Sequence, residues 1–224
     1  MTKLNSFRIA AYSLFFIIVI VLIVAYLAYS MNLLSESNFN AISNIDIELI
    51  FASLPFLIYA YNRVSFKRAY RELGLSIRYF NKRAILYTIA LIASVFLLEI
   101  LLAVFETVTG INLPTNVQQA FSSFPLYFYI FAAAVAPICE ELLFRGYLVP
   151  RFGIVISALI FAYLHYTSYL SISEFITALI FALLAGYIFK KTKSLYPSII
   201  THILVNTTAV ISLLSPALLH IVVV

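Results

Sequence analysis

Long apolar stretches separated by short polar segments dominate this chain. The apolar stretches lie at about residues 9–31, 48–61, 84–105, 124–149, 154–166, 174–189 and 196–214. A helix needs about 20 apolar residues to cross a bilayer, because each residue adds about 1.5 Å. The pattern therefore predicts an all-α, polytopic transmembrane helical bundle of about seven spans, with a short apolar tail at 217–224.

Three polar segments interrupt the apolar pattern. Residues 32–47 and 106–121 are predicted to be loops, whereas residues 63–83 interleave seven basic residues with apolar ones. Such interleaving is typical of an amphipathic segment on a membrane surface, and an ordinary basic cytoplasmic loop fits it equally well. We divide the chain into N-terminal spans with this basic segment, 1–83, and a helical core, 84–224, within one integrated membrane domain.

The composition agrees with a membrane location. Of the 224 residues 64% are hydrophobic and only 10% are charged, whereas soluble domains carry about 25% charged residues. After the spans are assigned, the length leaves no room for a separate soluble domain. The net charge of +5 does not indicate nucleic-acid binding, because the basic residues lie beside predicted spans.

The basic residues also predict an orientation. When the ends of the spans are numbered alternately, all 14 Lys and Arg residues fall on the side of the N-terminus. Lysine and arginine concentrate in cytoplasmic segments, so the N-terminus is predicted to be cytoplasmic. The segments on the other side contain no lysine or arginine, and the charged residues that they contain or border are acidic: Glu36, Asp46, Glu48, Glu106 and Glu174.

Residues 137–148 hold three charged side chains in an apolar run: Glu140, Glu141 and Arg145. A charged residue at bilayer depth costs about 2.5–3.5 kcal/mol, so it usually has a partner or a function. Glu141 and Arg145 are four residues apart and share a helix face, so they are expected to pair. Glu140 points about 100° away and is left as the expected chemical centre.

Two histidines are predicted to lie at the depth of Glu140. Counted from the cytoplasmic ends of their spans at about 1.5 Å per residue, Glu140 lies about 16 Å deep, His165 about 18 Å and His202 about 13 Å. Asn206 shares a helix face with His202. The common depth predicts one site, opening toward the cytoplasmic side. Glu99 is not placed in it.

Three motifs in this region resemble those of a known family: Glu140-Glu141-x-x-x-Arg145, Phe161-x-x-x-His165 and His202-x-x-x-Asn206. Their order over residues 120–210 is similar to that in the CPBP intramembrane proteases, which include CAAX proteases and bacteriocin-processing enzymes. Lys193 stands where that family often has glycine before a Ser-Leu pair, which affects a turn. The resemblance implies an intramembrane endopeptidase acting on a membrane-associated peptide, either a CAAX-type prenylated C-terminus or a leader peptide.

The resemblance also implies roles for the polar side chains. Peptide hydrolysis needs an activated water and donors for the oxyanion. Glu140 is the expected general base, with His165 holding the water. His202 and Asn206 are expected to stabilise the oxyanion. The remaining pair, Glu141 and Arg145, is expected to orient Glu140.

Several alternatives stay open at the level of the sequence. Glu140, His165 and His202 could instead ligate a divalent metal such as zinc. The chain has no His-Glu-x-x-His motif, and a metal-independent mechanism is slightly favoured. A non-catalytic immunity or scaffold protein of the same fold is a second reading. A proton-coupled transporter is less favoured, because no inverted repeat is visible.

Overall fold

The computed structural model describes residues 3–111, 113 and 116–222, where it forms helices and no strand. In chain order the helical segments are α1 (Lys3–Ser30), α2 (Glu36–Tyr61), α3 (Phe66–Glu72), η1 (Ile77–Tyr79), α4 (Lys82–Thr109), α5 (Val117–Ser122), α6 (Leu126–Ala134), α7 (Ala136–Glu141), η2 (Leu142–Leu148), α8 (Val149–Tyr169), α9 (Ile172–Thr192) and α10 (Tyr196–Val222). The all-helical prediction is confirmed.

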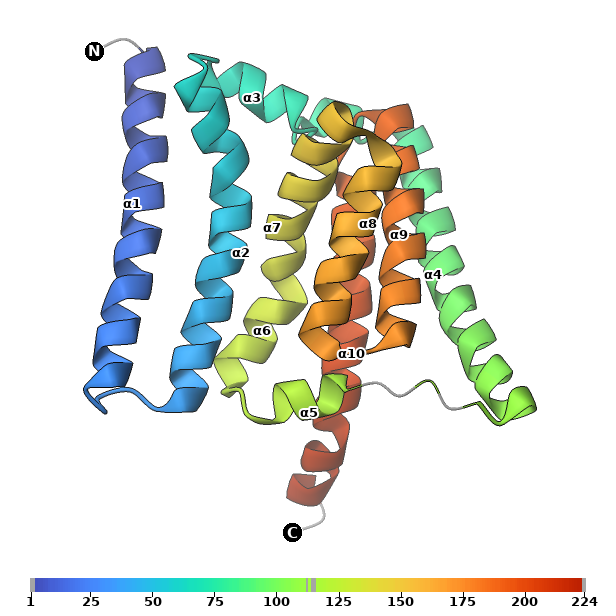
Figure 1. Cartoon of the computed structure of the whole chain (residues 1–224). Coiled ribbons are helices and arrows are strands. Elements are labelled where there is room, and N and C mark those ends of the chain that lie inside the picture. Colours follow the sequence, from blue (N-terminus) through green and yellow to red (C-terminus); the bar gives the residue numbers. More distant parts are fainter. Residues whose placement is uncertain (1–2, 112, 114–115, 223–224) are drawn as a thin grey trace.

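Six of the described helical stretches are long and apolar enough to cross a membrane, and Ile154–Tyr169 is a shorter apolar helix. The protein is therefore of the integral, multi-pass membrane type. Figure 1 shows the long helices side by side, with α3 across the end of the bundle that holds the N-terminus and α5 across the opposite end.

Two boundaries differ from the sequence prediction. The expected loop 32–47 is mostly helical, because α2 begins at Glu36, where the Ser35 side chain caps the helix by accepting the Asn38 N–H. The last helix does not end before Pro216 but continues to Val222. A proline in a membrane helix is tolerated when neighbouring groups satisfy the freed backbone. Part of the expected loop 106–121, at 112 and 114–115, lies outside the described residues.

The predicted fourth span is broken into three pieces. Helix α6 ends at Ala134 and α7 begins at Ala136. Pro137 has no N–H to donate to the preceding turn, and its ring clashes with the carbonyl four residues earlier. A π-helical turn, η2, follows Glu141 directly. Single π-turns are frequent at functional sites, and this one changes the helical register immediately after the paired glutamates.

The basic segment 63–83 packs against the helical core, a contact that neither sequence alternative specified. Leu73 is fully buried, and its carbonyl oxygen lies 3.0 Å from the position of a Cβ on Gly146. The Leu195 N–H donates to the Gly74 carbonyl at 3.1 Å. Lys193 has a φ of +59°, the left-handed conformation that glycine adopts most easily.

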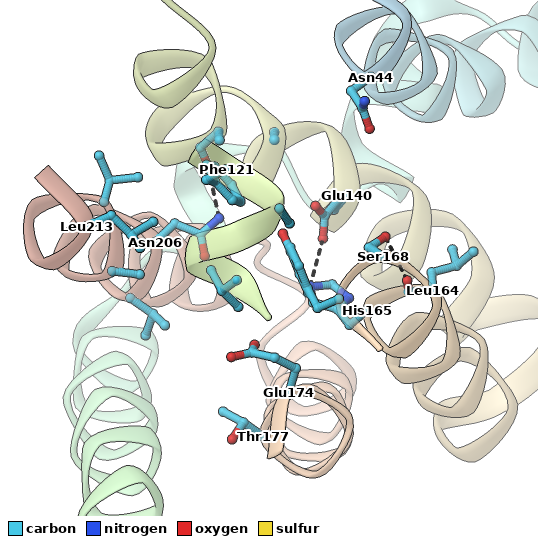
Figure 2. A pocket seen from close by; sticks show the side chains of 18 of the residues that line it. Asn44, Phe121, Glu140, Leu164, His165, Ser168, Glu174, Thr177, Asn206 and Leu213 are labelled. Carbon is cyan, nitrogen blue, oxygen red and sulfur yellow. Dashed lines mark hydrogen bonds and ion pairs between the residues drawn. The ribbon is translucent and has the colours of Figure 1, made fainter. Parts of the chain in front are cut away.

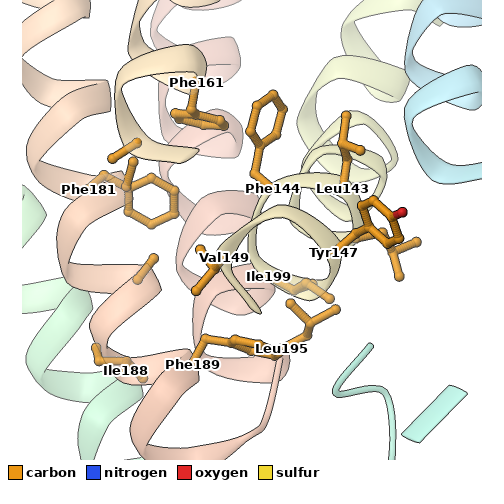
Figure 3. Close-up of a cluster of buried hydrophobic side chains, with 14 of the residues drawn as sticks. Leu143, Phe144, Tyr147, Val149, Phe161, Phe181, Ile188, Phe189, Leu195 and Ile199 are labelled. Atoms are coloured by element: carbon orange, nitrogen blue, oxygen red, sulfur yellow. The ribbon is translucent and has the colours of Figure 1, made fainter. Parts of the chain in front are cut away.

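Large side chains from η2, α8, α9 and α10 form the main core (Figure 3). Phe144 and Phe161 meet edge to face at a ring-centroid distance of 5.0 Å, and both are almost fully buried. This core joins the helices that carry the candidate motifs, so it sets the relative positions of those motifs.

Gly74 should be the least replaceable of the glycines with positive φ. An alanine Cβ there would lie 2.6 Å from the Phe189 ring and 2.9 Å from the Lys193 carbonyl oxygen, whereas at Gly110, also at positive φ, it would meet nothing within 4 Å. Both Gly→Ala changes cost about 1–2 kcal/mol of backbone strain, but Gly74→Ala adds about 1–3 kcal/mol of overpacking. Thermal unfolding in detergent should show the larger loss for Gly74→Ala; equal losses would contradict this account.

Candidate active site

Three helices bring Glu140, His165 and His202 together. The Glu140 Oε2 atom lies 4.0 Å from His165 Nε2 and 3.9 Å from His202 Nε2. The glutamate is only 8% exposed, and among the described residues this oxygen has no hydrogen-bond partner. The common depth predicted for the three residues is therefore realised as direct proximity.

Hydrogen bonds at the far side of each ring fix the two imidazoles. His165 Nδ1 lies 3.0 Å from the Phe161 carbonyl oxygen, and His202 Nδ1 lies 3.0 Å from Glu141 Oε1. Since both partners are acceptors, Nδ1 carries the proton in each ring. Both Nε2 atoms are thereby directed toward Glu140.

Glu141 and Arg145 form the ion pair that their four-residue spacing predicts. Arg145 Nη1 lies 2.9 Å from Glu141 Oε1, and the two side chains are 1% and 0% exposed. The guanidinium carbon is 4.1 Å from the ring centroid of Phe161 and 4.8 Å from that of Phe181. Contact with aromatic faces suits a desolvated cation. The pair therefore links η2 to α8 and α9, and Glu141 links it further to His202 on α10.

Asn206 lies one turn beyond His202 and reaches a different helix. Its Nδ2 donates to the Ala132 carbonyl of α6 at 3.0 Å, so it joins α10 to the piece of the fourth span that precedes Pro137. Asn206 also lines the cavity onto which Glu140 and His165 face. All six candidate residues thus belong to one connected region.

A cavity of about 740 Å³ extends from Glu140 and His165. Its wall comes from α2, α4, α5, α6, α7, η2, α8, α9 and α10. Figure 2 shows Glu140, His165, Glu174 and Asn206 around this space. The volume falls in the range of about 300–1,000 Å³ that is typical of ligand sites.

Glu99 lies on this wall, although sequence reasoning left it out of the site. The other glutamates of the wall are Glu48, Glu106, Glu140 and Glu174. Glu99 and Glu106 are seven residues apart on α4 and thus share a helix face. The seven-residue spacing of the two glutamates could have placed Glu99 on the cavity wall. The sequence reasoning compared only the depths of the polar residues and therefore left Glu99 out.

The cavity extends toward the end of the bundle that α5 crosses. Its wall includes Val117, Ala120 and Phe121 of α5, and α5 crosses the end remote from the N-terminus and α3 (Figure 1). The sequence predicted a site opening toward the basic, N-terminal side. The opening toward the cytoplasmic side stays a prediction, because the arrangement of the helices does not show which end of the bundle faces the cytoplasm.

A buried carboxylate therefore lies beside two imidazoles on a cavity wall, inside a multi-pass helical bundle. Residues 122–208 match the family model described as Rce1-like, type II CAAX prenyl endopeptidase. This match confirms the resemblance to the CPBP family, and the matched segment contains every candidate site residue. Comparison with curated proteins and with solved structures gave no match.

Loss of Arg145 should destabilise the fold strongly. Arg145→Met leaves Glu141 as a buried charge without its cation, which costs about 3–5 kcal/mol, whereas replacing both partners by neutral groups costs less. The double variant Glu141→Gln/Arg145→Met should therefore unfold at a higher temperature than Arg145→Met. Arg68→Met, which removes an exposed ion pair with Glu72, is the control and should change the unfolding temperature little.

Proposed function

We propose that this protein is an intramembrane endopeptidase that hydrolyses a peptide bond of a membrane-associated substrate with a water activated by Glu140. The observation that carries the proposal is the unpaired Glu140 Oε2, 8% exposed as a residue and within 4.0 Å of two imidazole nitrogens on the cavity wall. A carboxylate held in this way can take a proton from a water bound between it and the rings.

The surrounding groups suit the remaining steps of peptide hydrolysis. His165 Nε2 accepts a hydrogen bond from the water and positions it. His202 donates its Nδ1 proton in a hydrogen bond to Glu141. A second proton at Nε2 makes the His202 ring a cation next to the Glu141 carboxylate, and the Nε2–H can then donate to the oxyanion. The Asn206 amide has two hydrogens; one is used on Ala132 and the other serves the oxyanion.

The Rce1-like match supports a CAAX-type prenylated peptide as substrate, and a leader peptide of a secreted peptide is the other class that we retain. A non-catalytic scaffold of the same fold is less favourable. A scaffold has no need of an unpaired carboxylate at this depth, because burying one without a partner costs free energy. Glu141 and Arg145 act in this proposal as positioning residues for Glu140 and His202.

Zinc is a second candidate for activating the water. One ligand atom from each of Glu140, His165 and His202 lies within 4.8 Å of the others, and two histidines with a carboxylate are a zinc donor set that would lower the pKa of a bound water. We favour the metal-independent mechanism, because Glu140 lies 3.9 and 4.0 Å from the imidazoles. Ligands of a tetrahedral zinc with bonds of ~2.0–2.1 Å lie closer together, at about 3.3 Å.

Glu140→Gln should abolish cleavage of a farnesylated CAAX peptide by the purified protein. Loss of a positioned base lowers the rate by about 10²–10⁴-fold, and the amide is nearly isosteric, so the unfolding temperature should not fall. Glu36→Gln, which makes the same change away from the cavity, is the control and should keep full activity. Full activity of Glu140→Gln would refute the role of this residue.

A chelator titration distinguishes the two mechanisms. If Glu140 acts without a metal, kcat should stay within twofold when the protein is dialysed against a strong chelator. The metal content measured by mass spectrometry should be far below one equivalent per chain. Loss of activity that added zinc restores would establish the metal mechanism instead.

A further inference from the structure

Acidic and basic side chains are distributed unequally between the cavity wall and the rest of the chain. Five of the nine acidic residues of the sequence line the cavity. Among the described residues that form its wall, none is lysine or arginine. All 14 basic residues lie elsewhere, most of them in the segments at the end of the bundle that holds the N-terminus and α3. The acidic side chains are therefore concentrated on the cavity wall, whereas the basic side chains lie elsewhere.

Two carboxylates of the cavity wall have an oxygen without an internal hydrogen-bond partner in the described part of the chain. The Oε2 atoms of Glu48 and Glu140 are buried and have no hydrogen-bond partner among the described residues. Glu140 is more than nine-tenths buried as a residue, and Figure 2 shows its side chain directed at the space beside His165. Of the others, Glu106 accepts the Leu113 N–H at 2.6 Å, which ties it to the backbone.

We propose that the cavity binds a cationic segment of the peptide substrate, with lysine or arginine side chains lying against Glu48, Glu99 and Glu174 while the scissile bond lies at Glu140. This inference rests on the proposed function and names a substrate class for it.

The physical basis is the low dielectric of a cavity inside a helical bundle. Charges of one sign on low-dielectric walls focus the potential, which raises the local concentration of an oppositely charged ligand. Coulomb interactions there are stronger than in water. The same carboxylates repel acidic peptides, so they would act in specificity as well as in affinity.

Two farnesylated CAAX peptides test the proposal: one with three lysines directly before the cysteine, the other with three glutamines there. Binding by fluorescence anisotropy and cleavage are measured together on the full-length protein in nanodiscs. We expect a KM and Kd about tenfold lower for the lysine peptide, which corresponds to about 1.4 kcal/mol, with similar kcat. The preference should shrink as salt is raised, because salt screens the charges.

Matched double variants locate the effect. Glu48→Gln/Glu99→Gln should remove most of the lysine preference by raising the KM and Kd of the lysine peptide toward those of the glutamine peptide. Glu36→Gln/Glu72→Gln removes the same charge outside the cavity wall and should keep the preference. These pairs avoid Glu106, which binds a backbone N–H, and Glu174, which lies in the first turn of α9.

The outcomes separate the two proposals. Cleavage of both peptides with equal KM overturns the cationic-substrate inference and leaves the peptidase standing. Preferential binding of the lysine peptide without cleavage overturns the peptidase and supports the acidic binding site. Loss of the preference in the Glu36/Glu72 variant as well would show a general charge effect and overturn the assignment to the cavity. If neither peptide is bound or cleaved, both proposals are overturned.

Discussion

The buried pair of Glu141 and Arg145 is the interaction on which the site depends. Two opposite charges that are almost fully removed from solvent are costly to bury unless each keeps its partners. Arg145 keeps Glu141 and two aromatic faces, and Glu141 keeps Arg145 and His202. These contacts span α7, η2, α8, α9 and α10. The packing of five helical segments is thereby coupled to the orientation of one imidazole that faces Glu140.

Local distortions of the fourth span let neighbouring glutamates serve different purposes. Glu141 points into the ion pair and Glu140 points to the cavity, since consecutive helical residues diverge by about 100°. Pro137 ends the regular hydrogen bonding of the preceding turn, and the π-turn follows at once. The result is a carboxylate that no side chain of the described structure neutralises by a hydrogen bond, held beside two rings whose outer nitrogens are already occupied.

The two ends of the bundle differ for a structural reason. At the end that holds α3, Leu73 and Gly74 pack against η2 and the start of α10, and the Tyr196 hydroxyl donates to the Leu75 carbonyl at 2.8 Å. At the other end the helices part around the cavity, and glutamates line its wall. The packed contacts lie at the basic end, and the acidic cavity wall reaches the end that α5 crosses.

The helical membrane class, the Glu141–Arg145 pair and the common depth of Glu140, His165 and His202 could be predicted from the sequence alone. Each follows from spacing, because apolar length sets a span, four residues set a shared face, and 1.5 Å per residue sets a depth. The breaks around Pro137, the packing of Leu73, the inclusion of Glu99 in the wall and the end toward which the cavity extends became visible only in the folded protein. These depend on contacts between segments far apart in the chain, and a one-dimensional pattern gives the depth of a side chain without giving the neighbours that surround it.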